Sequence, residues 1–180
     1  MVVKKRLQAF TLIELLVAVA IFSVAVGISA EAFVNVSRML KRAEVVYNLQ
    51  QDSRFVLEKL AQEMRVGTID YSQQTVFRGA ASLYLLNSSN ESVNFVWQNN
   101  KLYLAKAGQF GLTNITPQNL KIVNLAFFVA PEQDPLNMAS PMQPRVTLMM
   151  KTIQADTEKL AEQAVELNIQ TTVSSRVYRQ

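Results

Sequence analysis

The ionisable side chains that could do chemistry gather near the N-terminus of this 180-residue chain. Lys4, Lys5 and Arg6 form a basic cluster, and Glu14 follows inside a long apolar segment. The chain has no histidine and no cysteine, which excludes Ser–His and Cys–His catalysis, disulfides, and zinc sites built from those residues. We find no other catalytic arrangement, so the sequence predicts a protein that is not an enzyme and that uses no cofactor.

Glu14 is the one charged residue of an apolar segment that covers residues 10–30. An ionised carboxylate is costly in hydrocarbon, so a segment that keeps one there needs a positive partner for it. The segment itself contains no lysine and no arginine. The nearest positive group that the protein can supply is a free α-amine made by cleavage of the chain, either its own or that of a neighbouring molecule.

The segment 10–30 has the length of a membrane-spanning helix. At about 1.5 Å per residue, it is just long enough to cross a hydrocarbon core of roughly 30 Å. The basic cluster in front of it predicts a cytoplasmic N-terminus and a C-terminal domain on the outer side of the membrane. Without those three positive charges the formal net charge falls from +4 to +1, so the basic composition gives only weak support for nucleic-acid binding.

The run Ala9-Phe10-Thr11-Leu12-Ile13-Glu14, behind a short basic leader, resembles the processing site of type IV prepilins and type II secretion pseudopilins. The resemblance implies that a prepilin peptidase cuts between Ala9 and Phe10 and that the new amine of Phe10 is methylated. Glu14 would then be the glutamate that the family carries as its fifth mature residue. Ala9 stands where the family usually has glycine.

This resemblance also implies partners, namely other pilins or pseudopilins that pack through their helices, the peptidase, and an inner-membrane assembly platform. The alternative is an ordinary secretory signal peptide or a plain signal anchor. The apolar core of a signal peptide is shorter, about 7–15 residues, and it rarely carries a carboxylate near its start. The sequence therefore favours a single-pass membrane protein that later enters a filament.

An amphipathic helix is expected to follow the membrane segment. Residues 31–65 contain neither glycine nor proline, and Gly67 predicts the end of the helix. We expect a leader at 1–9, an assembly helix at 10–30, an amphipathic half at 31–66, and a globular domain at 67–180. The predicted apolar stripe consists of Val36, Met39, Ala43, Val46, Leu49, Ser53, Val56, Leu60 and Met64.

Short β-rich segments follow Gly67. Strands are expected at 75–77, 82–86, 92–97, 101–106, 119–129, 145–154 and 166–175. Asn99 and Asn100 predict a tight turn between two of them, and the proline-rich stretch 131–144 predicts a loop. Residues 155–164 predict a loop or a helical turn. The expected fold class is α+β, with a long N-terminal helix packed on an antiparallel β-sheet in the manner of a pilin.

A second resemblance rests on the end of the helix and on the closing strand. The late helix residues Gln51, Arg54, Leu57, Leu60 and Glu63-Met64-Arg65, with the closing run Gln170-Thr171-Thr172-Val173-Ser174-Ser175-Arg176, look like the J-type minor pseudopilins and related minor pilins. This resemblance implies a structural minor subunit of a type IV pilus or of a type II secretion pseudopilus.

Two other functions remain as alternatives. A minor pilin of a DNA-uptake pilus would have a sheet domain that binds DNA or a partner, through clustered basic and aromatic residues. A membrane-anchored hydrolase would be left with carboxylate or Ser–Lys chemistry, for which no motif is present. Nucleic acid is not an expected partner, because the basic residues of the sheet domain are scattered: Arg78, Lys101, Lys106, Lys121, Arg145 and Lys151.

One acidic loop has the residue types of a calcium site. Glu132 and Asp134 lie close to Gln133 and Asn137. Oxygen ligands of this kind suit calcium, but the ligand spacing of an EF-hand is absent. A solvated acidic loop is the simpler interpretation.

Overall fold

The structure is a computed structural model that describes residues 11–137, 142–155 and 165–175. The chain divides into two compact parts, residues 1–44 and residues 45–180. The first part contains the N-terminal portion of helix α1, and the second contains the rest of that helix and all the strands.

Helix α1 runs from Leu12 to Val66, which confirms the long N-terminal helix predicted from the sequence. It continues through Gly27 and ends directly before Gly67, whose N–H donates to the Glu63 carbonyl oxygen at 2.8 Å. A Cβ atom at Gly67 would lie 2.9 Å from that oxygen and 3.0 Å from the Leu86 carbonyl oxygen. The helix therefore ends where the Glu63 and Leu86 carbonyl oxygens leave too little room for a side chain.

Five strands form the first antiparallel sheet. They are β1 (Thr68–Ile69), β3 (Ser82–Leu86), β4 (Ser92–Gln98), β5 (Lys101–Lys106) and β6 (Thr113–Asn114), in the order β1-β3-β4-β5-β6. The predicted turn between β4 and β5 is confirmed, because Asn99 and Asn100 have φ angles of 51° and 60°. Two consecutive residues with positive φ match the right-handed twist of a hairpin.

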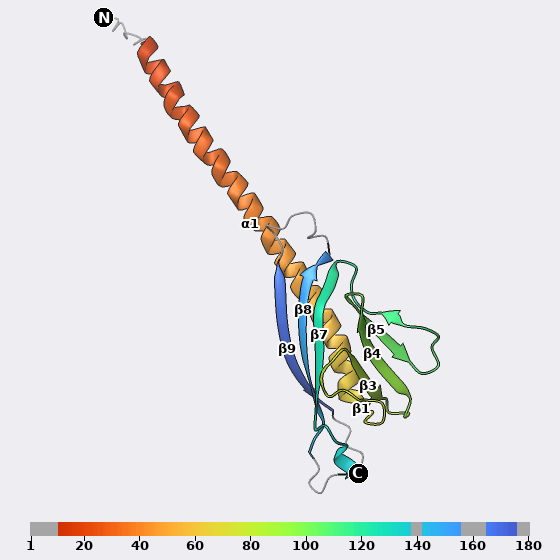
Figure 1. Cartoon of the computed structure of the whole chain (residues 1–180). Coiled ribbons are helices and arrows are strands. Elements are labelled where there is room, and N and C mark those ends of the chain that lie inside the picture. The colour runs from red at the N-terminus through yellow and green to blue at the C-terminus, as the bar shows by residue number, and fades with distance from the viewer. Residues whose placement is uncertain (1–10, 138–141, 156–164, 176–180) are drawn as a thin grey trace, which may run out of the picture. The chain divides into compact units, whose positions relative to one another are not determined.

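Four strands form the second sheet, which lies along the C-terminal half of α1 (Figure 1). They are β2 (Arg78–Ala80), β7 (Leu120–Ala130), β8 (Arg145–Gln154) and β9 (Glu166–Ser174), in the order β2-β7-β8-β9. All pairs are antiparallel. A short 3-10 helix, η1 (Pro135–Asn137), interrupts the predicted loop after β7.

The core is made by the inner faces of both sheets and one stripe of α1. The stripe is buried from Leu49 onward, and alternating residues of the central strands pack against it. Ser53 of α1 and Thr152 of β8 are fully buried polar residues between the helix and the second sheet, and their hydroxyl oxygens form a hydrogen bond of 3.0 Å. Because each hydroxyl satisfies the other, this buried pair does not destabilise the core.

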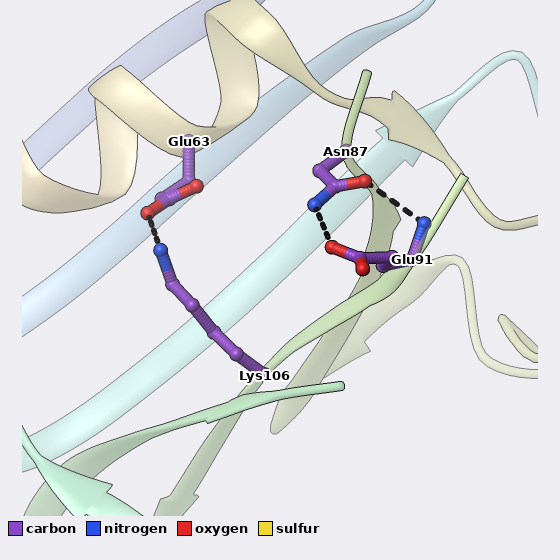
Figure 2. Close-up of polar contacts among 4 residues, drawn as sticks. All are labelled: Glu63, Asn87, Glu91 and Lys106. Carbon is purple, nitrogen blue, oxygen red and sulfur yellow. Dashed lines mark hydrogen bonds and ion pairs between the residues drawn. The ribbon is translucent and has the colours of Figure 1, made fainter. Parts of the chain in front are cut away.

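Polar contacts join the helix to both sheets. The Ser175 hydroxyl donates to the Gly67 carbonyl oxygen at 2.6 Å, and Lys106 of β5 forms an ion pair with Glu63 of α1. Figure 2 shows this ion pair beside the turn after β3, where the Asn87 amide donates to the Glu91 carboxylate and its oxygen accepts the Glu91 N–H. The Ser175 hydrogen bond and the Lys106 ion pair hold the end of the helix region against the end of β9 and against β5.

Four predictions about the fold are corrected. There are two sheets instead of one. Residues 75–77 form no strand, because the Gln74 side chain donates to the Val76 carbonyl oxygen and accepts the Tyr84 N–H. The short strands β1, β2 and β6 were not predicted. Val36, Met39 and Ala43 of the predicted stripe are exposed. Most of the predicted segment 155–164 lies outside the described residues.

Candidate processing and assembly site

Five of the predicted site residues lie outside the described part of the chain: Lys4, Lys5, Arg6, Ala9 and Phe10. The predicted leader and the predicted cleavage between Ala9 and Phe10 therefore stay predictions. Glu14 is described and lies on the first turn of α1, with its side chain exposed in the single chain. The site is built here from Glu14 and the helix that follows it.

Thr11 caps the helix that carries Glu14. The Glu14 N–H lies 3.4 Å from the Thr11 hydroxyl oxygen and 3.1 Å from the Thr11 carbonyl oxygen. The first N–H groups of a helix have no partner within it, and a threonine just before the helix satisfies one of them. Thr-x-x-Glu is the pattern of a capping box, so this sequence signal for Thr11 was present and was missed. The cap fixes Glu14 within the first turn, close to the positive end of the helix dipole.

The surface of α1 from residue 15 to residue 30 is apolar on every side. Large aliphatic and aromatic side chains from Leu12 to Ile28 are exposed, and the most apolar 18-residue window of the helix has a mean hydropathy of 2.5 with none of it buried. Such a helix is long and apolar enough to cross a membrane. An apolar surface this large indicates that lipid or other helices cover it.

The hydroxyl groups in this apolar stretch are satisfied by the helix itself. Ser23 donates to the Val19 carbonyl oxygen and Ser29 donates to the Ala25 carbonyl oxygen, both at 2.8 Å. A serine bonded four residues back needs no polar partner from outside the helix. Glu14 is thus the one ionisable side chain of the described residues 11–30.

The acidic loop has other partners. Glu132 forms an ion pair with Arg78, and the Asp134 carboxylate accepts the Leu136 N–H at 3.0 Å. Within the described residues, no group of three or more acidic, histidine or cysteine side chains is close enough to hold a metal ion. The arrangement is that of a structured polar loop.

Three of the six basic residues listed for the sheet domain form ion pairs with carboxylates. Besides Arg78 with Glu132, Lys106 pairs with Glu63 and Lys151 pairs with Glu166. A DNA-binding surface needs basic side chains that can approach phosphates together. These ion pairs give no support to the nucleic-acid alternative.

One family description matches the chain, the prokaryotic N-terminal methylation motif, over residues 4–30. No curated protein and no solved structure matches the chain. The matched segment contains the basic cluster, Phe10, Glu14 and the apolar helix described above. It supports a type IV pilin-like protein that is processed by prepilin peptidase, is anchored in a membrane by its N-terminal helix, and assembles with other pilins. Such a role is structural.

Proposed function

We propose that this chain is a minor pilin or pseudopilin, a structural subunit of a type IV pilus or of a type II secretion pseudopilus. The uncut chain spans the membrane once, with residues 1–9 in the cytoplasm and the sheet domain outside. Hydrolysis of the Ala9–Phe10 peptide bond releases the leader, and the new amine of Phe10 is methylated. The processed subunit then leaves the lipid and enters a filament through its N-terminal helix.

One observation carries this proposal: an apolar helix surface that is unpartnered within the described chain and holds a single carboxylate, Glu14, at its start. A plain membrane anchor has no use for that carboxylate, which is costly in lipid. A helix that packs among equivalent helices can offer it a positive partner in each neighbour. The motif match over residues 4–30 supports the same interpretation.

Glu14 sets the axial register between subunits in this account. Four residues of helix separate it from Phe10, which corresponds to about 6 Å along the axis. A neighbouring subunit that is shifted by about this distance brings its own Phe10 amine to the Glu14 carboxylate. A buried polar pair of this kind specifies register, as single polar residues do in coiled coils.

The finer assignment to a J-type minor subunit has weaker support. It rests on the late helix residues and on the closing run from Gln170. In the fold these two segments are tied together, because the Ser175 hydroxyl bonds to the Gly67 carbonyl oxygen at the end of α1. No observation favours the DNA-uptake alternative over this structural role.

The N-terminus of the mature protein tests the proposal. Mass spectrometry of the chain isolated from its own cells should show a methylated Phe10 as the first residue. Ala9→Asp should block maturation, whereas Ala9→Gly should be cut at least as well as the wild type. A mature chain that begins at Met1, or one that is cut after residue 30, would contradict the proposal.

A further inference from the structure

Strand β9 is the longest outer strand of the two sheets in the described part of the chain, and no described strand pairs with its outer edge. The other edges are β1 and β6, with two residues each, and β2, with three residues and an irregular register. β9 has nine residues and pairs with β8 without any register shift. It contains no proline, and its one charged residue, Glu166, lies at its first position. Sheet edges are usually protected by charges, prolines, bulges or short length, and β9 has none of these in its interior.

The pairing between β8 and β9 shows which backbone groups of β9 form no hydrogen bond to β8. The Ser175 N–H donates to the Pro144 carbonyl oxygen, and Arg145 lies opposite Ser174 in the next pair. Hydrogen-bonded pairs alternate along an antiparallel ladder, so the odd-numbered residues of β9 bond to β8. The backbone N–H and C=O groups of Asn168, Gln170 and Thr172 therefore point outward, away from the sheet.

A groove runs beside this edge on the inner face of the sheet. One hollow of about 470 Å³ is lined by Leu167 and Ile169 of β9. On the α1 side it is lined by Leu57 and by polar residues, namely Tyr47, Gln50, Gln51 and Arg54. A second hollow of about 320 Å³ continues it along Thr171 and Val173. Leu167 and Ile169 are only half-buried, whereas the inward-facing residues of β8 are fully buried. The inner face of the sheet therefore leaves apolar side chains partly exposed at β9.

We infer that β9 is a docking edge for an extended segment of a neighbouring subunit, which adds to the second sheet as a further strand. The free backbone groups would give its main chain a regular ladder of hydrogen bonds, and its side chains at alternate positions would face the groove. Water can satisfy the same backbone groups but cannot cover Leu167 and Ile169. The partner segment is thus extended and free of proline at its bonding positions. Its groove-facing side chains combine an apolar stem, which covers Leu167 and Ile169, with a polar end, which meets the amide and guanidinium groups of α1. The identity of the partner as a filament subunit rests on the proposed function.

Amide exchange with single-residue resolution tests this inference on the full chain. Hydrogen exchange is compared between unassembled protein in membranes and protein in sheared filaments. Assembly should slow exchange at Asn168, Gln170 and Thr172 by at least about tenfold, while Ile169 and Thr171 are already protected by β8. This alternating pattern is specific to strand addition. No change at the three even-numbered amides, or protection of them already in the unassembled chain, would overturn the inference.

A proline variant gives a second test. Gln170→Pro removes an outward N–H and no bond to β8, so it should lower incorporation into filaments about tenfold. Gln170→Thr keeps the N–H and should incorporate within about twofold of the wild type. The fluorescence of Trp97, the one tryptophan of the chain, reports whether the variant is folded. If Gln170→Pro is misfolded, the exchange pattern of the wild type decides alone.

The outcomes separate this inference from the proposed function. Folded Gln170→Pro that enters filaments as well as Gln170→Thr would overturn strand addition and leave the proposed function standing. Absence of the wild-type chain from filaments would overturn the proposed function, and the inferred partner with it.

Discussion

Leu16 and Leu60 lie on the same helix, yet Leu16 is 58% exposed and Leu60 is 1% exposed. The two leucines differ in whether other residues of the chain pack against them. Around Leu60, both sheets supply a packed core within residues 45–180, whereas no described residue covers the apolar side chains of residues 12–30. The chain itself covers the apolar side chains around Leu60. The apolar side chains of residues 12–30 need other molecules to cover them, which indicates that assembly takes place there.

The largest expected effect comes from truncating the two leucines in turn. Leu60→Ala should lower the free energy of unfolding of the sheet domain by about 2–5 kcal/mol, because it leaves a cavity in the core. Leu16→Ala should change that free energy by less than about 0.5 kcal/mol. Thermal unfolding of the detergent-solubilised full chain, followed by Trp97 fluorescence, measures both. Equal destabilisation by the two changes would contradict the conclusion that the chain covers Leu60 and leaves Leu16 uncovered.

A smaller effect is expected from replacing either of the two glycines of the helix region by alanine. One replacement should destabilise the protein and the other should stabilise the helix. A Cβ at Gly67 meets two backbone oxygens, so Gly67→Ala should destabilise the sheet domain by about 1–3 kcal/mol. A Cβ at Gly27 meets nothing within 4 Å, and Gly27→Ala should favour the helix by up to about 1 kcal/mol. Trp97 fluorescence measures the first and helical circular dichroism in detergent measures the second. A stabilised Gly67→Ala variant would refute the close approach at the helix end.

The sequence predicted elements well where a pattern extends over many residues. The bounds of 82–86, 101–106 and 145–154 agree with β3, β5 and β8, because five or more alternating residues define a strand. Strands of two or three residues, such as β1, β2 and β6, contain too few positions to show a period. The segment 75–77 was predicted wrongly because the effect of the Gln74 side chain depends on contacts with distant residues.

The arrangement of strands in two sheets could not be predicted, since alternation shows which residues face inward but not which strands are neighbours. The same limit hid the free edge of β9. For the candidate site, Glu14 stood out because a carboxylate in an apolar run is physically costly. Thr11 was overlooked although its spacing to Glu14 is that of a capping box.

Glu14 gives the most direct test of the central claim, which is that the N-terminal helix exists to pair with other subunits. Glu14→Gln keeps the shape of the side chain and removes its charge, so membrane insertion and cleavage should continue. Incorporation into sheared filaments should fall at least about tenfold relative to the wild type, because the amine of the neighbouring subunit loses its partner. Incorporation of the Glu14→Gln chain at the wild-type level, with equal amounts of both proteins in the membrane, would contradict the account.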